Sequence, residues 1–273
     1  MKIHYVDNLQ KLRNILSNFY IEKKERKWVF RGQIDRKDWP LVPKAGRKDL
    51  KLRIPDENLF RAWKRHAYAL VPRSFESDWE WLYIAQHHGL ITRLLDWTTN
   101  PLAATFFAIR HIQTDFGSPI KKPLDNNVAV WAYRDEKGWG AGERDSPPEE
   151  PFTLFDNTED KTEFKPIESK HKERAIKENR VKKFVQRVVP KYVTQRLVNQ
   201  HGIFTYHDPP DLSLDNDIFK GRSLEKIIIK KKCLIDLQLF LSLYGINEKT
   251  MFPDIDGLSR FLNWDYREIN SNE

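Results

Sequence analysis

Three short segments of this chain concentrate side chains that can bind a ligand or move a proton. The first is WVFRG at residues 28–32, where an arginine closes an aromatic, β-prone run. A guanidinium makes bidentate contacts to phosphate or carboxylate, and a glycine permits close approach of another backbone. Arg31 is therefore a candidate catalytic and ligand-binding residue, and Gly32 a candidate ligand-binding residue. A buried salt bridge from Arg31 to a carboxylate such as Asp96 is an equally good interpretation.

The second segment, HHGLITRLLDWTTNP at residues 87–101, places polar residues in an otherwise apolar run. If residues 91–97 are extended, Thr92 and Asp96 share one face, while Arg93 points to the other. Buried polar groups need partners, so Thr92 and Asp96 are expected to meet groups such as Arg31.

Asp96 is the obvious carboxylate of this segment and therefore a candidate catalytic residue. Thr92, Arg93 and Thr98 are the candidate ligand-binding residues of the same segment. A purely structural hydrogen-bond network is the alternative interpretation.

The third segment is QRLVNQHGIFTYH at residues 195–207. A polar helix end runs through Gly202 into a strand, and the amide of Gln200 is a candidate ligand contact. A helix cap followed by an ordinary strand is the alternative, and it is favoured.

Several common signatures are absent from the sequence. It contains no GxGxxG, no Walker A, no HExxH and no cysteine or histidine spacing typical of a metal site. His87 and His88 are adjacent, so on a helix they point in different directions and would not chelate one metal. A histidine favoured by the helix C-terminus is the preferred interpretation.

The elements that must position these segments follow from periodicity and turn residues. Helices are expected over residues 7–20, 57–70, 77–88, 101–109, 193–200, 231–243 and 255–264. Strands are expected over residues 28–30, 91–97, 127–133, 182–189, 203–207 and 224–229.

No regular alternation of strand, helix and strand connects these elements. The predicted fold class is α+β, with a small mixed or antiparallel sheet flanked by several helices. One large domain is expected over residues 1–264. Residues 138–177 are predicted to be a flexible insertion within it, since their first part is rich in Gly, Pro, Asp and Glu.

Composition excludes several classes of protein. The 273 residues are 40% hydrophobic and 12% aromatic, which is too apolar for a disordered chain. Cys233 is the single cysteine, so no intramolecular disulfide can form. The N-terminus lacks the apolar run of a signal peptide and the apolar stretches are too short to cross a bilayer. A cytoplasmic location without a membrane partner is the resulting expectation.

The formal charge of +8 and the pI of about 9.3 allow a polyanionic partner. Basic clusters at residues 23–27, 182–183 and 230–232 make nucleic acid one candidate. Lysines that maintain solubility are the preferred interpretation, because this charge is modest for the chain length.

Taken together, the three segments resemble the FRG-domain family, which is named after its aromatic-Arg-Gly motif. FRG at residues 30–32 matches the name motif, and QHHGLITRLLDWTTNPLAA at residues 86–104 resembles the longest signature. RLVNQHGIF at 196–204, LYGI at 243–246 and MFPDIDGL at 251–258 are similar to its later motifs. The resemblance spans roughly residues 8–262, and residues 138–177 match no motif.

The order of elements also looks like that of ADP-ribosyltransferases. In their arginine-serine-glutamate class, a strand arginine helps to bind NAD, a hydroxyl-bearing strand shapes the nicotinamide pocket, and a later glutamate activates the acceptor. The resemblance implies the first role for Arg31 and the second for Thr92 or Thr98. The later strand of this sequence carries no glutamate at the corresponding place. Neutral amides such as Gln200 cannot act as a base in its stead.

Three hypotheses follow. The first is an ADP-ribosyltransferase-like enzyme with NAD as substrate and Asp96 as its carboxylate, or a protein that binds such a nucleotide without transfer. The second is a nucleic-acid-binding protein that uses its basic surface. The third is a non-catalytic ligand sensor in a stress or phage-defence setting.

Overall fold

The computed structural model of the chain describes most of the sequence. The described residues are 1–21, 28–35, 39–50, 52–71, 75–110, 127–135, 150–154, 167–179, 181–215 and 222–266.

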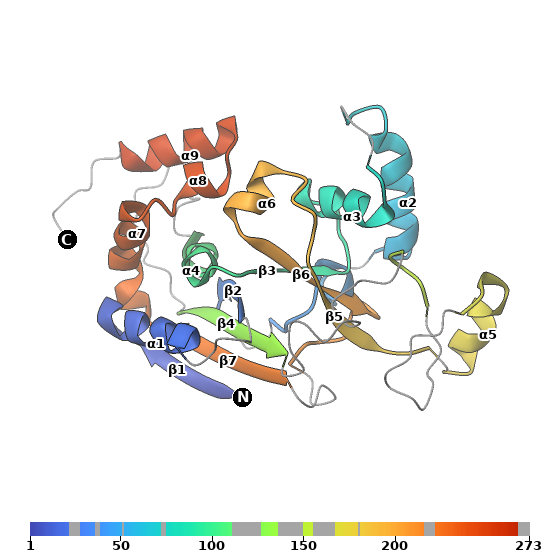
Figure 1. The fold of residues 1–273 in the computed structure, drawn as a ribbon, viewed down its shortest axis with the longest axis horizontal. Helices are drawn as coiled ribbons and strands as arrows, with labels where there is room; N and C mark the ends of the chain where they lie inside the picture. The colour runs from blue at the N-terminus through green and yellow to red at the C-terminus, as the bar shows by residue number, and fades with distance from the viewer. Residues whose placement is uncertain are drawn as a thin grey trace.

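The fold is α+β, as predicted, and is built on a seven-stranded mixed sheet with the strand order β1-β7-β4-β2-β3-β6-β5 (Figure 1). Only the β1–β7 pair is parallel among these neighbours. The strands are β1 (Lys2–Val6), β2 (Val29–Ile34), β3 (Leu94–Thr98), β4 (Val128–Asp135), β5 (Phe184–Val188), β6 (Gly202–Asp208) and β7 (Arg222–Ile229). The sheet is thus larger than the small sheet expected, partly because β1 was not predicted from the sequence.

The helices occupy the predicted places, with two additions. They are α1 (Leu9–Ile21), α2 (Asp56–Ala67), α3 (Asp78–His87), α4 (Pro101–Ile109), α5 (Lys172–Lys177), α6 (Gln195–Asn199), α7 (Leu234–Leu243), α8 (Glu248–Met251) and α9 (Ile255–Asp265). The short helices α5 and α8 were not predicted, and α5 lies in the segment that was expected to be a flexible insertion.

Side-chain caps set the start of the two helices nearest the candidate site. The Ser77 oxygen accepts the Glu80 amide at 3.3 Å, and the Glu80 carboxylate accepts the amide of Glu76. Asn100 accepts the amides of Leu102 and Ala103 ahead of α4. The Asn100 cap fixes where α4 begins after β3.

One face of the sheet is covered by two groups of helices (Figure 1). Over β1, β7, β4 and β2, apolar residues of α1, α4 and α7 form one cluster with Phe30, Val130 and Ile227. Over β3, β6 and β5, residues of α2 and α3 form a second cluster with Leu94 and Phe204. The candidate site lies on this face, beside the second group.

The opposite face is covered mainly by loop residues. Val29, Trp97 and Ile203 point to this face and form a third cluster with Leu41 and Leu212 of the connecting segments. Because this face is sealed by apolar packing, a ligand site is expected on the helix-covered face.

Gly32 belongs to the packing of β2 against α4. A Cβ at this position would lie 1.8 Å from the carbonyl oxygen of Ala104 and 2.5 Å from the amide nitrogen of Ala108. The close approach that the sequence predicts therefore exists, but it is made by a helix backbone. This assigns Gly32 a packing role, and we do not place it in the ligand site.

Gly32→Ala is therefore expected to lower the free energy of unfolding by about 2 kcal/mol or more, because neither backbone can move aside cheaply. Urea unfolding measures this change. Gly202→Ala is the matched control, since its Cβ would meet the flexible side chain of Leu197 at 3.0 Å. Equal effects of the two substitutions would contradict this account.

The predicted insertion at residues 138–177 falls mainly outside the described residues, as does the basic cluster at 23–27. Its described parts are residues 150–154, which bring Phe152 into the second cluster, and residues 167–177, which include α5. Among the described helices, none combines the length and the apolar character that a bilayer span requires.

Candidate functional site

The sheet register brings the three sequence segments together. β3 lies between β2 and β6, and Thr98 pairs with Phe30 on one side and with Gly202 on the other. Residues about seventy and one hundred positions apart are therefore neighbours on three adjacent strands.

A small hollow opens beside these strands and is lined by residues of α3, α6, β3 and β6. The space it encloses is about 40 Å³, well below the roughly 300–1,000 Å³ typical of small-molecule sites. The hollow is lined by Tyr83, Gln86, His87, Asp96, Arg196, Leu197, Gln200 and Phe204.

The Asp96 carboxylate is the acidic group of this hollow. Its side chain is 60% exposed, and the side-chain amide of Gln86 donates to both carboxylate oxygens at 3.2 Å. Asp96 is therefore held in place yet open to a ligand. The ion pair between Arg31 and Asp96 therefore exists, but its carboxylate side is exposed.

Arg31 approaches Asp96 from β2. Its Nη1 donates to the backbone oxygen of Asp96 at 2.7 Å and lies 3.8 Å from the carboxylate Oδ2. Among the described residues, β2 and β3 pair at one position, Phe30 with Thr98. The Asp96 carbonyl lies beyond that position and accepts from the Arg31 guanidinium instead. Arg31 stands in the middle of β2, which corrects the expectation that it closes the strand.

The Arg31 guanidinium is desolvated and incompletely partnered. Its Nε is buried without a hydrogen-bond partner. Burial lowers the pKa of Arg31, the Asp96 charge opposes that shift, and the Arg47 charge adds to it. A cation in this state favours an additional acceptor from a ligand.

Two further arginines, Arg47 and Arg196, act electrostatically with Asp96. Burial is the main cause that lowers the pKa of each, and Asp96 raises the pKa of both. Arg47 also lies 5.3 Å from the ring centre of Trp39, with its Nε buried and unpartnered. The sequence analysis did not select either arginine; only the RLVNQHGIF motif pointed to Arg196.

The two threonines make internal contacts near the site. Thr92 is buried and donates to the side-chain oxygen of Gln86, which holds that amide toward Asp96. Thr98 donates to the backbone oxygen of Gln200 at 2.7 Å. The structure therefore shows Thr92 and Thr98 as residues that position Gln86 and Gln200.

Gln200 links the hollow to the α8 region. Its side-chain nitrogen donates to the Met251 carbonyl at 2.8 Å, which leaves the amide oxygen to accept from a ligand. Tyr83 and Phe204 form the aromatic part of the lining, with ring centres 5.4 Å apart and planes within 8°. The lining thus combines one aromatic wall with amides and charges.

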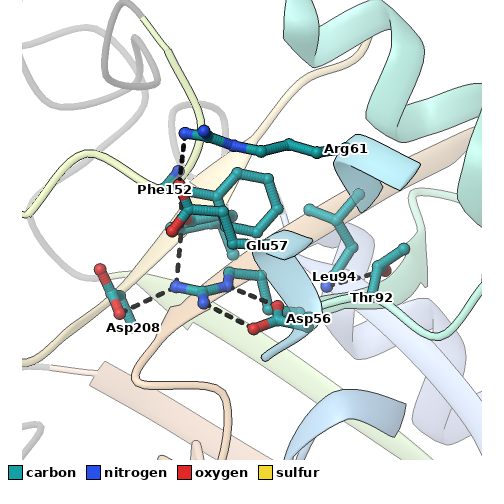
Figure 2. A network of polar contacts seen from close by, with 9 residues as sticks. Asp56, Glu57, Arg61, Thr92, Leu94, Phe152 and Asp208 are labelled. Carbon is teal, nitrogen blue, oxygen red and sulfur yellow. Dashed lines mark hydrogen bonds and ion pairs between the residues drawn. The ribbon is translucent and has the colours of Figure 1, made fainter. Parts of the chain in front are cut away.

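Arg93 lies apart from the hollow, in a buried ionic network (Figure 2). It donates to both oxygens of Asp56 at 2.7 Å and to Asp208 at 3.0 Å. Its guanidinium also lies 4.7 Å from the ring centre of Phe152. These contacts occupy the guanidinium, so Arg93 has a structural role here and we do not propose it as a ligand contact.

The pKa values of both Arg93 and Asp208 are shifted in this network. Burial would lower the pKa of Arg93, but its hydrogen bonds to Asp56 and the charges of both carboxylates raise the pKa of Arg93 above its usual value. Burial raises the pKa of Asp208 to about 6, which the Arg93 charge opposes. Arg93 is therefore held in its charged form between the two acids.

His87 and His88 stand at the end of α3, as predicted. Burial, together with the charge of Arg196, lowers the pKa of His87 to about 4, so its imidazole is neutral near pH 7. No group of three or more metal-binding side chains occurs in the part of the chain that the structure describes.

The two described basic clusters do not form one surface. Residues 182–183 precede β5 at one edge of the sheet, whereas residues 230–232 follow β7 near the other edge. Lys230 additionally lies 5.2 Å from the ring centre of Tyr5. A continuous basic stripe for nucleic acid is thus not formed by these two clusters.

Comparison with known families gives one finding. Residues 26–116 match the family profile described as the FRG domain, which includes the FRG triplet, α3 and β3. Comparison with curated proteins gives no match, and comparison with solved structures gives none. The matched range includes Arg31, Gln86 and Asp96, whereas Arg196 and Gln200 lie outside it.

Proposed function

We propose that this chain, which belongs to the FRG-domain family through residues 26–116, binds an NAD-type dinucleotide and breaks its nicotinamide–ribose bond. The observation that carries the proposal is that Asp96 of β3 and Gln200 at the end of α6 line one hollow, while the Arg31 guanidinium of β2 donates to the backbone oxygen of Asp96.

The proposal places the nicotinamide end of such a ligand across the mouth of the hollow. The enclosed space of about 40 Å³ is too small to take up the whole ring, so the ring would rest against the lining residues. The Tyr83–Phe204 wall offers a surface for the ring, and the Gln200 oxygen offers an acceptor for the carboxamide. The remainder of the ligand would extend out of the hollow.

Asp96 supplies the chemistry in this proposal. The bond between ribose C1′ and the nicotinamide nitrogen breaks, and its electron pair stays on the leaving nicotinamide, which becomes neutral. A hydroxyl, amine or water of the acceptor forms the new bond to C1′ and gives its proton to the Asp96 carboxylate. The same carboxylate stabilises positive charge that develops on the ribose, as in other glycosidic cleavages.

Arg31 acts mainly as a positioning residue in this scheme. Its hydrogen bond to the Asp96 backbone fixes the strand that carries the carboxylate. Arg31 and Arg47 together also offset the negative charge of a dinucleotide.

The test is incubation of the protein with NAD, with release of nicotinamide followed by proton NMR and binding by calorimetry. We expect NAD-dependent heat and nicotinamide release. Arg31→Lys keeps the charge but loses the planar fork, so about tenfold slower release is expected. Arg61→Lys, at an exposed arginine on α2, is the matched control and should leave the rate unchanged.

The proposal fails if saturating NAD produces neither heat nor nicotinamide with the wild-type chain. A binding signal without nicotinamide release would instead support the alternative of a nucleotide-binding module. Circular dichroism of both variants establishes that each substitution leaves the chain folded.

A further inference from the structure

Three guanidiniums gather around one aromatic ring at the rim of the hollow. The ring is that of Phe252, directly after α8, and is 4% exposed. Arg110 lies 4.0 Å from its centre, Arg196 lies 4.5 Å away, and Arg260 lies 5.3 Å away. They come from the end of α4, from α6 and from α9, so only the tertiary structure brings them together.

Glu248 pairs with two of these three cations. Its side chain is 3% exposed, one oxygen accepts from the Arg110 Nε at 2.5 Å, and the other accepts from the Arg260 Nε at 2.8 Å. Arg110 makes a second contact with Glu248 at 3.2 Å. Both carboxylate oxygens are thus occupied by Arg110 and Arg260.

Arg196 has no such partner. Among the described residues, no carboxylate lies within ion-pair distance of it, and its polar contact is a long one of 3.4 Å to the His87 carbonyl. Burial lowers the pKa of Arg196, and Arg110 and Arg260 add to that shift, while Asp96 and Asp254 oppose it from a greater distance. A desolvated cation without a close counter-ion favours an anion.

We propose that Arg196, supported by Arg110 and Arg260, is a subsite for the diphosphate group of the nucleotide. The cluster borders the hollow directly, since Arg196 is part of its lining. Guanidinium forks match phosphate oxygens in two-point contacts, and three neighbouring cations suit a group that carries more than one negative charge. This inference rests on the proposed function for the identity of the ligand, but the anion subsite is testable without NAD.

Inorganic pyrophosphate is the probe. Titration of the wild-type chain at physiological ionic strength, followed by calorimetry, is expected to show saturable binding. Arg196→Gln is expected to weaken that binding about tenfold or more, because a charge-assisted contact is lost. Arg61→Gln, which removes the same charge from an exposed site, should leave the affinity unchanged within about twofold.

A second measurement uses the wild-type chain and avoids any folding defect of the variant. Pyrophosphate should shift the side-chain Nε–H resonance of Arg196 in a nitrogen-proton spectrum, with the same midpoint as the calorimetric titration. The resonance of Arg61 should not move. Absence of saturable pyrophosphate binding, or equal weakening by Arg196→Gln and Arg61→Gln, overturns the inference.

The outcomes separate this inference from the proposed function. Arg196-dependent pyrophosphate binding with no response to NAD keeps the anion subsite but removes its assignment to a dinucleotide. Nicotinamide release with no Arg196-dependent pyrophosphate binding keeps the activity and removes the subsite. If both hold, Arg196→Gln should raise the KM for NAD and leave kcat within a few-fold, as expected for a binding contact away from the bond that breaks.

Discussion

Asp96→Asn is expected to lower the rate constant of nicotinamide release by about 10²–10⁴-fold, the usual contribution of a positioned acid or base. Asparagine keeps the shape of the side chain but can neither take up the acceptor proton nor offset positive charge on the ribose. The KM for NAD should change by no more than a few-fold, because the lost interaction develops only as the bond breaks. Steady-state kinetics with NAD measures both quantities.

The fold should survive this substitution. The short hydrogen bond from Arg31 reaches the backbone oxygen of Asp96, which asparagine retains, and the carboxylate itself is 60% exposed. Gln86 can still donate to the amide oxygen of asparagine. We therefore expect a thermal unfolding midpoint within a few degrees of the wild type.

Asp265→Asn is the matched control, since it removes an exposed carboxylate at the end of α9. Its rate should equal that of the wild type. If folded Asp96→Asn protein released nicotinamide as fast as the control, Asp96 would not be the reacting carboxylate.

Arg93→Ala is expected to lower the free energy of unfolding by about 3–5 kcal/mol, which is the largest stability effect we expect for a single substitution. It removes the guanidinium that Asp56 and Asp208 share, although both carboxylate side chains are less than a tenth exposed (Figure 2). The two acids would then be buried without a counter-ion, and Phe152 would lose a packing partner.

Urea unfolding at pH 7 measures this loss, with Arg61→Ala as the control. Arg61 pairs with Glu57 on the same helix as Asp56, but its side chain is 70% exposed, so its removal should cost about 0.5 kcal/mol or less. A further variant, Arg93→Lys, keeps the charge and loses the fork that spans both oxygens of Asp56, so an intermediate loss is expected. If the Arg93 variants lowered the free energy of unfolding no more than Arg61→Ala does, the network would contribute little to stability.

The contrast between Arg31 and Arg93 could not be drawn from the sequence. Both are arginines next to apolar strand residues, and either fits a salt bridge or a ligand contact. The structure pairs Arg93 with Asp56 and Asp208, which lie 37 and 115 positions away, whereas Arg31 meets the backbone of an exposed aspartate. Such pairings depend on which strands become neighbours.

Local sequence determined the elements that frame the site. Ser77 and Asn100 cap helices at the predicted starts because a cap depends on a side chain and amides two or three residues further along. The α+β class and most strands followed equally from short-range patterns and turn residues. The edge strand β1 was missed because its partner β7 is more than two hundred residues away.

Tertiary structure alone decided which polar residues line the hollow. The order β2-β3-β6 brings Asp96 beside Arg31 and beside the segment that carries Gln200, and the packing of α4 on β2 gives Gly32 a structural role. The local spacing of residues in the sequence indicated neither Arg47 nor the gathering of arginines around Phe252. Periodicity records what a residue does within its own helix or strand, but the burial and charge that make a site come from contacts between segments far apart in the chain.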